Sequence, residues 1–230
     1  MGRNKDRQAR LEQAVAERRR QMTQYHSYTE DEMFMMDGVP VSSVLDFWRF
    51  EFASLIGMVG TIGEYLVCLA LEIPKAENVL KWTGYDLSYR NKRIEVKATS
   101  YIHAWNKEKH SNVRTFSIAP SNNQYWLVKD ENDTKKLSRQ NELYVFCVNT
   151  QQDYESFDPL RVDSWKFYVV PTYRINKYCD SYGNPNQKTM KLQVVQSLAG
   201  EAVKWSGLKE KIEAAIDDVD RWVEENDNNG

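Results

Sequence analysis

The feature that most constrains the fold of this chain is the segment 84–100, in which charged and apolar residues alternate. It predicts a β-hairpin with a first arm at 85–89 and a β-branched second arm at 93–99, joined by a polar turn. Because successive side chains of a strand point to opposite faces, Glu95 and Lys97 share one face. The other face of the second arm carries the apolar residues Ile94, Val96 and Ala98.

The first arm of this hairpin carries Asp86, which antiparallel pairing brings alongside Glu95. Two neighbouring carboxylates repel each other unless something neutralises them. Mg²⁺ prefers such oxygen ligands and would neutralise the pair. Beside them, Lys97 can orient a metal-adjacent water or stabilise developing negative charge. Together these groups are suited to metal-assisted hydrolysis of a phosphodiester bond.

A plainer interpretation is that Glu95 and Lys97 form a solvated ion pair on an exposed strand. The chain contains the same acid-X-lysine pattern at Asp133 and Lys135, where the surrounding polar segment shows no strand pattern. The β-branched context of Glu95 and the presence of Asp86 one arm earlier favour the functional interpretation.

Asp86 followed by Glu95, Val96 and Lys97 on the next strand resembles the PD-(D/E)XK nuclease superfamily, which has the restriction-endonuclease-like fold. That family usually carries an acidic residue on the helix before the first core strand. Glu64, in the apolar segment 60–67, matches that position, whereas Tyr85 replaces the proline that precedes the family's aspartate. The resemblance covers roughly residues 59–99 and implies the element order α-β-β-β-α-β.

The resemblance also implies a role for each residue of the motif. Asp86 and Glu95 would bind Mg²⁺, or Mn²⁺ in its place, together with the backbone carbonyl of Val96. Lys97 would position the attacking water and stabilise the pentacovalent phosphate. Glu64 would hold a second metal ion or an outer-shell water. The implied function is a Mg²⁺-dependent nuclease acting on double-stranded DNA, in restriction, repair, recombination or phage defence.

Composition is that of a soluble globular protein, with 41% hydrophobic and 28% charged residues among 230. The net charge of −2 does not by itself indicate nucleic-acid binding, but positive charge gathers in residues 3–20 and 90–139. A nearly neutral total therefore allows a basic cleft. The three cysteines are scattered without metal-binding spacing, which indicates a reducing compartment and a cytoplasmic protein.

The sequence predicts no membrane attachment. Its hydrophilic N-terminus is unlike a signal peptide. The apolar segment 54–73 is interrupted by Glu64 and Glu72 and contains three glycines, so it predicts a buried helix rather than a membrane span. We expect those glycines to allow close helix packing.

Two basic segments are candidates for contact with nucleic acid. Residues 1–24 predict a basic helix, which is either a solvated terminal helix or an arm that contacts phosphates. Residues 101–110 interleave aromatic and basic side chains, which suits either a nucleic-acid groove or a surface loop anchored by one tryptophan. The predicted contact residues are Arg18, Arg19, Arg20, Lys92, Arg93, Trp105, Lys107 and Lys109.

Other elements follow from spacing and breakers. We expect helices at 30–36, where residues 29–32 form a capping box, at 42–55 with a serine N-cap, and around Glu64 up to Pro74. We expect strands at 115–119, 142–148 and 165–170, and a loop at 173–188. A last helix, capped by Ser206, presents an apolar face made by Leu208, Ile212, Ala215, Ile216, Val219 and Val223.

The predicted fold is α/β, a restriction-endonuclease-like mixed β-sheet flanked by helices, with extra N-terminal helices and a C-terminal helix. Residues 1–41 would form a basic helical extension, 42–224 the nuclease domain and 225–230 an acidic disordered tail. Two other functions stay open, a non-catalytic nucleic-acid-binding module on the same fold and a protein-interaction module. A homodimer, or partner proteins of a defence or repair system, are compatible with the sequence.

Overall fold

A mixed four-stranded sheet forms the centre of the protein, as the sequence predicts. The computed structural model describes residue 13 and residues 28–73, 85–102, 114–121 and 137–227. In the central sheet, β4 and β6 are parallel and the two outer pairs are antiparallel. The spatial order is β3 (Leu87–Tyr89), β4 (Lys92–Ser100), β6 (Leu143–Asn149) and β7 (Trp165–Pro171).

The predicted hairpin at 85–99 is confirmed as β3 and β4. Leu87 pairs with Ile94 and Tyr89 with Lys92, so the connection contains only Arg90 and Asn91. These two residues have φ values of 48° and 60°. Positive φ at both positions is the geometry of a tight hairpin turn whose twist matches that of the flanking strands. The turn therefore fixes the register that places Asp86 beside Glu95.

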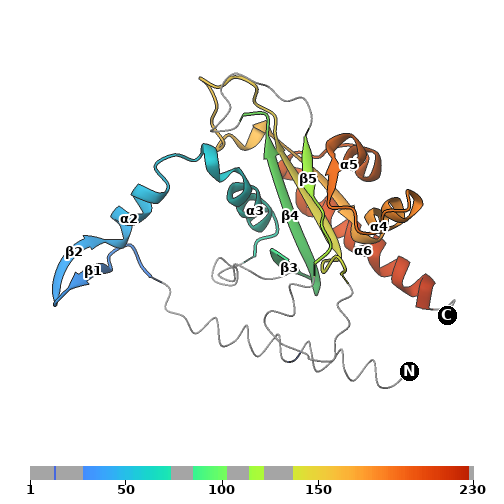
Figure 1. Cartoon of the computed structure of the whole chain (residues 1–230), viewed down its shortest axis with the longest axis horizontal. Coiled ribbons are helices and arrows are strands. Elements are labelled where there is room, and N and C mark those ends of the chain that lie inside the picture. The colour runs from blue at the N-terminus through green and yellow to red at the C-terminus, as the bar shows by residue number, and fades with distance from the viewer. Residues whose placement is uncertain (1–12, 14–27, 74–84, 103–113, 122–136, 228–230) are drawn as a thin grey trace.

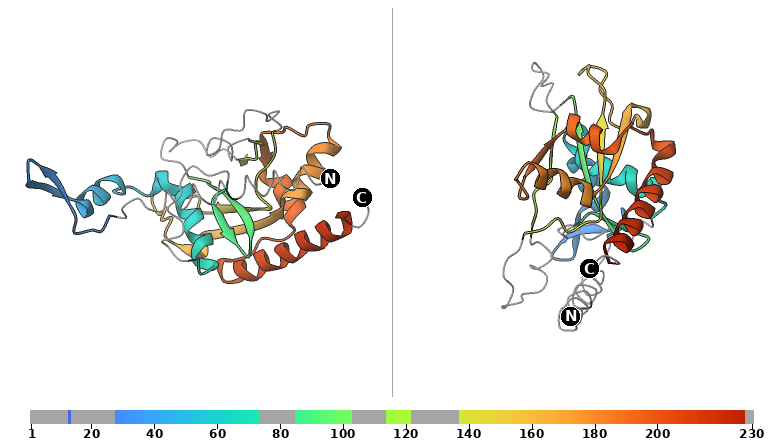
Figure 2. Two further views of the ribbon diagram at one scale, coloured as in Figure 1. Left: turned by 90° about the horizontal axis from the view of Figure 1, so that it is seen from below. Right: turned by 90° about the vertical axis from the view of Figure 1, so that its right-hand side faces the viewer.

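Helices cover both faces of the sheet and make three layers (Figures 1 and 2). On one face, α3 (Val59–Ala70) and α6 (Leu208–Asp227) pack on a core that includes Val67, Val96 and Ile212. On the other face, α4 (Thr172–Ser181) and α5 (Leu192–Ala199) pack on a second core. That core includes Phe116, Phe146, Ile175 and Val195. All seven residues of β6 are buried, because both of its faces are covered.

Gly63 allows α3 to lie directly on the sheet. A Cβ at this position would come within 2.7 Å of the Ala98 Cβ on β4 and within 3.4 Å of the Cys147 Cβ on β6. The prediction that glycine permits close packing is thus confirmed at Gly63. Gly60, by contrast, faces open space. This close approach sets the distance between the helix that carries Glu64 and the strand that carries Glu95.

A second, small sheet joins two distant parts of the chain. The predicted strand near 115 is confirmed as β5 (Thr115–Ser117), but it pairs with β8 (Thr189–Lys191) rather than with the central sheet. Phe116 and Met190, which face each other in this sheet, are both buried in the second core. No helix lies between β4 and β6 in the residues that are described there.

The segment 28–52, which we call the arm, projects from the three-layer body (Figures 1 and 2). It contains β1 (Met33–Met36), β2 (Val39–Ser43) and α2 (Val44–Glu51). The predicted N-cap Ser43 is confirmed, since its Oγ accepts a 3.0 Å hydrogen bond from the Asp46 N–H. The helix ends at Glu51, four residues before its predicted end, and a 3₁₀ turn (Ile56–Met58) leads into α3.

The prediction of a helix at 30–36 is wrong. The capping-box bond does form, from the Thr29 N–H to Glu32 Oε1 at 2.7 Å, but a strand follows it. Asp37 and Gly38, with φ values of 51° and 81°, turn the chain back so that β1 pairs with β2. An Asp-Gly pair between two apolar runs is a strong hairpin signal, and it overrides the helix-start signal upstream.

The C-terminal part contains one further correction. Residues 172–181 form α4 rather than the start of a loop, because Ile175 and Cys179 are spaced to bury one face of a helix. The last helix is confirmed, although Ser206 lies in a 3₁₀ turn (Trp205–Gly207) before α6 rather than capping it. A further 3₁₀ turn (Val162–Ser164) precedes β7. Helix α6 continues to Asp227, into the segment for which a disordered tail was predicted.

Length and composition of the described helices bear on membrane attachment. In the described residues, no one helix combines the length and apolar character needed to cross a bilayer. The segments Val44–Glu51 and Ile56–Ala70 would satisfy that test only jointly, and they meet at an angle of 86°.

Candidate functional site

The structure brings Asp86, Glu95 and Lys97 together, as predicted. Asp86 directly precedes β3, and its N–H donates a 3.0 Å hydrogen bond to the Ile94 carbonyl. Its Oδ2 accepts a 2.7 Å hydrogen bond from the Val96 N–H. Glu95 and Lys97, on the same face of β4, form an ion pair. The Asp86 carboxylate is therefore fixed to the backbone of the strand that presents the other two groups.

Burial disturbs both carboxylates of this cluster, and the charge of Asp86 adds to its effect at Glu95. Burial raises the pKa of Asp86, although Lys97 and the Val96 N–H oppose the shift. Burial, and then the charge of Asp86, raise the pKa of Glu95 to about 7 despite the nearby Lys97. The Glu95 side chain is only 18% exposed. It is therefore not the solvated ion-pair partner of the plainer interpretation.

Lys97 is the positive group in the middle of the cluster. Burial alone would lower its pKa, but the charges of Glu95, Asp86 and Glu64 more than offset this effect. The resulting pKa of Lys97 is higher than usual, so the side chain stays protonated at neutral pH. A partly buried, protonated amine beside two carboxylates is suited to stabilising an additional negative charge.

Glu64 lies at the edge of the site. Its charge acts on both Glu95 and Lys97, but in each case it is the weakest of the named influences on the pKa. It belongs to α3, which Gly63 holds against β4. The structure therefore places Glu64 within electrostatic reach of Glu95 and Lys97, with a weaker influence on Glu95 than Asp86 has.

The residues present suit a hard divalent cation held by few protein ligands. Within the described residues, no three His, Cys, Asp or Glu side chains form a group arranged to hold a metal ion. Asp86 and Glu95 supply two carboxylates, and the Val96 backbone adds a carbonyl oxygen. Mg²⁺ is commonly bound by one or two carboxylates, with water and substrate oxygens completing its octahedron. Because Asp86 Oδ2 is engaged by the Val96 N–H, Oδ1 is the oxygen left for a ligand.

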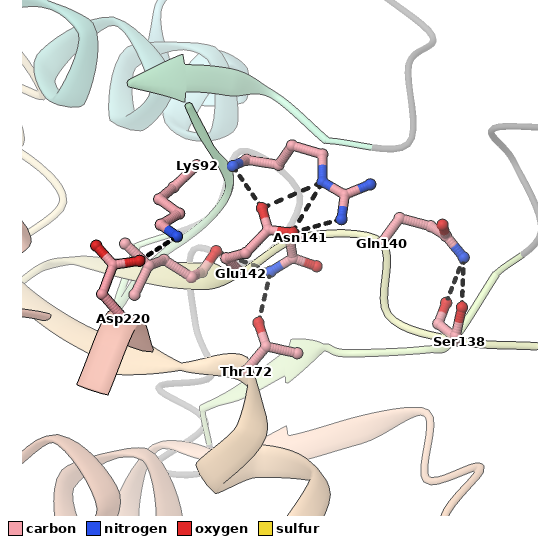
Figure 3. A network of polar contacts seen from close by, with 9 residues as sticks. Lys92, Ser138, Gln140, Asn141, Glu142, Thr172 and Asp220 are labelled. Atoms are coloured by element: carbon pink, nitrogen blue, oxygen red, sulfur yellow. Dashed lines mark hydrogen bonds and ion pairs between the residues drawn. The ribbon is translucent and has the colours of Figure 1, made fainter. Parts of the chain in front are cut away.

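Two of the predicted nucleic-acid contacts are engaged in ion pairs (Figure 3). Lys92 pairs with Asp220 of α6. Arg93 pairs with Glu142, whose Oε2 also accepts a 2.7 Å hydrogen bond from the Arg93 backbone N–H. These contacts hold α6 and the start of β6 against β4, so either residue would have to leave an ion pair to bind a phosphate. The other predicted contacts, Arg18, Arg19, Arg20, Trp105, Lys107 and Lys109, lie outside the described residues.

A hydrogen-bond network next to these ion pairs fixes the start of β6 (Figure 3). The buried Asn141 donates from Nδ2 to the Leu143 carbonyl at 2.7 Å and to Thr172 Oγ1 at 3.1 Å. Gln140 donates to Ser138 Oγ at 2.6 Å. The network ties the chain entering β6 to the first residue of α4. It thereby fixes the strand that lies alongside Glu95 and Lys97.

Tyr144 adjoins the site and was not predicted from the sequence. It lies opposite Glu95 in the parallel pairing of β4 with β6 and is only 3% exposed. Burial and the charge of Glu95 raise the pKa of its phenol, which therefore stays neutral. The sequence shows Tyr144 only as part of an apolar run. Its proximity to Glu95 depends on which strand pairs with β4, and no local pattern reveals that.

Arg114 is a second residue that the sequence did not single out. Its side chain is buried, and its guanidinium lies 4.3 Å from the centre of the Tyr101 ring. Within the part of the chain that the structure describes, its Nε and Nη2 have no hydrogen-bond partner. Tyr101 directly follows the last residue of β4 and packs on the same core as Tyr144. Arg114 therefore lies on the sheet face that carries the site.

Comparisons with known proteins do not extend these observations. The chain was compared with protein-family models, with curated proteins and with solved structures, and none gives a significant match. The resemblance to PD-(D/E)XK nucleases thus rests on four residues in sequence order and on the meeting of Asp86, Glu95 and Lys97 at the β3–β4 hairpin.

Proposed function

We propose that this protein is a cytoplasmic, Mg²⁺-dependent nuclease that hydrolyses phosphodiester bonds in double-stranded DNA. The observation that carries the proposal is the partly buried Glu95–Lys97 ion pair beside the anchored Asp86 carboxylate. Burying charges costs stability, and replacing a buried ion pair by apolar side chains is often stabilising. A cluster of this kind on a core strand is therefore better explained by chemistry than by folding.

Each side chain has a defined task in this reaction. Asp86, Glu95 and the Val96 carbonyl would hold Mg²⁺. The bound ion would polarise the phosphate and lower the pKa of a water molecule that attacks it. Lys97 would donate from Nζ to that water or to a phosphate oxygen as negative charge develops. Glu64 would accept a hydrogen bond from an outer-shell water.

The Glu95–Lys97 ion pair also suggests how Lys97 becomes available. Nζ of Lys97 is paired with the Glu95 carboxylate in the structure. Once that carboxylate binds a cation, its attraction for the lysine falls, because its charge is shared. Nζ of Lys97 would then be able to donate a hydrogen bond to the substrate from its position on β4. Cation binding and substrate binding would thus be coupled through one side chain.

Arg114 supports a nucleic-acid substrate. Its Nε and Nη2 form one edge of the guanidinium, which can bind two oxygens of the same phosphate. From Lys97 to Ser100, the residue before Tyr101, the strand advances by about 10 Å, at roughly 3.3 Å per residue. Arg114 would thus contact a phosphate some nucleotides away from the cleaved bond. Both nitrogens are covered in the structure, so this contact requires the covering chain to shift.

The proposal is tested by incubating purified protein with supercoiled plasmid in Mg²⁺, Mn²⁺, Ca²⁺ or EDTA. We expect cleavage in Mg²⁺ and Mn²⁺ and none in EDTA. Lys97→Ala and Glu95→Gln should each lower the rate by about 10²–10³-fold or more. The matched control is Lys166→Ala, which removes an exposed lysine from the neighbouring strand β7 and should cleave normally.

Three results separate the candidate functions. Equal cleavage in EDTA, or unimpaired cleavage by Lys97→Ala, would overturn the mechanism. DNA binding in Ca²⁺ without cleavage in any metal would indicate the non-catalytic binding module. Neither binding nor cleavage of DNA would leave the interaction module as the remaining interpretation.

A further inference from the structure

The arm exposes an unusual number of large apolar side chains. Val44 is the one buried residue of the arm, all of whose residues are described. The exposed fraction of the others reaches 80% at Phe50. A lone two-stranded hairpin with a short helix is marginally stable in water, and contiguous apolar surface usually marks an interaction site. The exposed apolar residues are Met33, Phe34, Met35, Met36, Val39, Val41, Phe47, Phe50 and Phe52.

This surface belongs to one structural unit. The ring of Phe34 on β1 packs edge-on against Phe47 on α2, with ring centres 5.9 Å apart. The Val44 N–H donates a 2.8 Å hydrogen bond to the Glu32 carbonyl, which ties the start of the helix to the start of the hairpin. The apolar residues of hairpin and helix are therefore presented together, away from the three-layer body (Figure 2).

We propose that the arm is a dimerisation element that packs against a second copy of this chain. Aromatic side chains bury about 150–250 Å² each when fully covered, and the smaller methionine and valine side chains bury less. Nine of them, each roughly half exposed, offer on the order of 800 Å². That area matches what each partner contributes to a stable protein–protein interface, about 800 Å². This inference does not depend on the proposed nuclease activity.

The charges of the arm indicate what kind of partner covers it. Its charged residues are mostly acidic, which repels anionic lipid headgroups and DNA phosphates. Phenylalanine and methionine are typical of the centres of protein interfaces. Within the described part of the chain, each strand of the hairpin also has one edge without a strand partner, which a symmetric copy can pair with or cover. The charged residues are Glu30, Asp31, Glu32, Asp37, Asp46 and Glu51, against the single basic residue Arg49.

The acidic rim gives the dimer a characteristic dependence on salt. Two like-charged rims repel each other, and this repulsion is screened as ionic strength rises. The apolar contact itself is not weakened by salt. The dimer should therefore become tighter with added NaCl. A contact held by opposite charges would weaken under the same conditions.

The full-length protein is tested by sedimentation velocity over a wide concentration range and at two salt concentrations. We expect a species of twice the 27.0 kDa chain mass. Phe50→Glu and Val41→Glu should raise the dimer Kd by about 30-fold or more. Tyr182→Glu is the matched control, because Tyr182 is 71% exposed on the body. It should leave the Kd unchanged. Circular dichroism confirms that each variant is folded.

A second measurement does not require the charged variants to fold. Cys68, Cys147 and Cys179 are all buried, so an exposed cysteine introduced by Met36→Cys is the reactive thiol. Mild oxidation should give a covalent dimer with Met36→Cys and none with Tyr182→Cys. The proposal is overturned by a wild-type protein that stays monomeric, by arm variants that dimerise normally, or by a dimer that weakens with salt. A cross-link that forms equally at both positions also overturns it.

Discussion

The two β-hairpins of this protein share a turn design but differ in what they bury. Both reverse direction in two residues with positive φ, Asp37-Gly38 in the arm and Arg90-Asn91 in the body. The arm hairpin exposes its apolar side chains, whereas the body hairpin presents partly buried charges. The arm hairpin exposes apolar side chains that are usually buried, and the body hairpin partly buries charges that are usually exposed. Such departures cost stability, and they mark the places where function is to be sought.

The difference arises from neighbours rather than from local sequence. β4 has β3 on one edge and β6 on the other, and α3 covers one of its faces through the close contact at Gly63. In contrast, among the described residues β1 and β2 pair only with each other. The same kind of hairpin thus becomes a core element in one place and an interaction surface in the other. Four predictions test this contrast, and the largest effect comes first.

Removal of the same side chain should have very different effects in the two hairpins. Val96 on β4 is 4% exposed and Val41 on β2 is 64% exposed. Val96→Ala should lower the free energy of unfolding by about 2–3 kcal/mol, because it removes buried methyl groups and leaves a cavity. Val41→Ala should change it by less than about 0.5 kcal/mol in the monomer. Urea unfolding at low protein concentration measures both, and equal losses would contradict the contrast.

Two glycines of α3 provide the second test. Gly63→Ala places a methyl group 2.7 Å from the Ala98 Cβ, so it should destabilise the protein by about 1–3 kcal/mol through overpacking. Gly60→Ala meets nothing within 4 Å. It should stabilise the helix by about 0.5–1 kcal/mol, because alanine is the better helix former. Thermal melts of the two variants should therefore shift in opposite directions. A shift in the same direction would mean that α3 does not pack as described.

The candidate site could be predicted because short-range rules determine its geometry. Alternation along β4 puts Glu95 and Lys97 on one face, and the antiparallel partner brings Asp86 to the same point. Helix α6 and the strands β6 and β7 also follow from continuous or periodic apolar patterns. These features depend on neighbours in sequence, so one sequence is enough to infer them.

The parts that could not be predicted depend on contacts between distant residues. Tyr144 approaches Glu95 only because β6 pairs with β4, and Arg114 reaches Tyr101 only because the chain returns after β4. Helix α4 was missed because its apolar positions are few and its face is completed by the second core. In the arm, the capping-box signal at Thr29 and Glu32 predicts a helix, but the Asp37-Gly38 turn makes the following residues pair as a hairpin.

The third prediction concerns the charge cluster of the body hairpin. Asp86→Asn removes one of two buried negative charges but keeps an oxygen that can accept the Val96 N–H. In EDTA we expect this variant to melt about 2–4 °C above wild type, which corresponds to roughly 1 kcal/mol. It should also lose most of the stabilisation that Mg²⁺ gives to wild type, because a ligand stabilises only the state that binds it.

Asp86→Ala is the control for this experiment. It removes the same charge but leaves the buried Val96 N–H without its acceptor, so it should melt below Asp86→Asn. Differential scanning calorimetry with and without Mg²⁺ measures all three proteins. Asp86→Asn melting below wild type in EDTA, with an unchanged Mg²⁺ shift, would make Asp86 an ordinary structural residue.

The last prediction is a pH dependence that belongs to Glu95. Its pKa is raised from 4.5 to about 7 in the folded protein, so between these values the folded state holds a proton that the unfolded state has lost. Stability then falls as pH rises through this window, by about 1.4 kcal/mol per pH unit at most. Glu95→Gln lacks the titrating group. In EDTA, the difference in unfolding free energy between wild type and Glu95→Gln should therefore fall from pH 4.5 to 7. Outside that window it should be flat, and a flat difference throughout would mean that Glu95 is solvated like the charges on the surface of the arm.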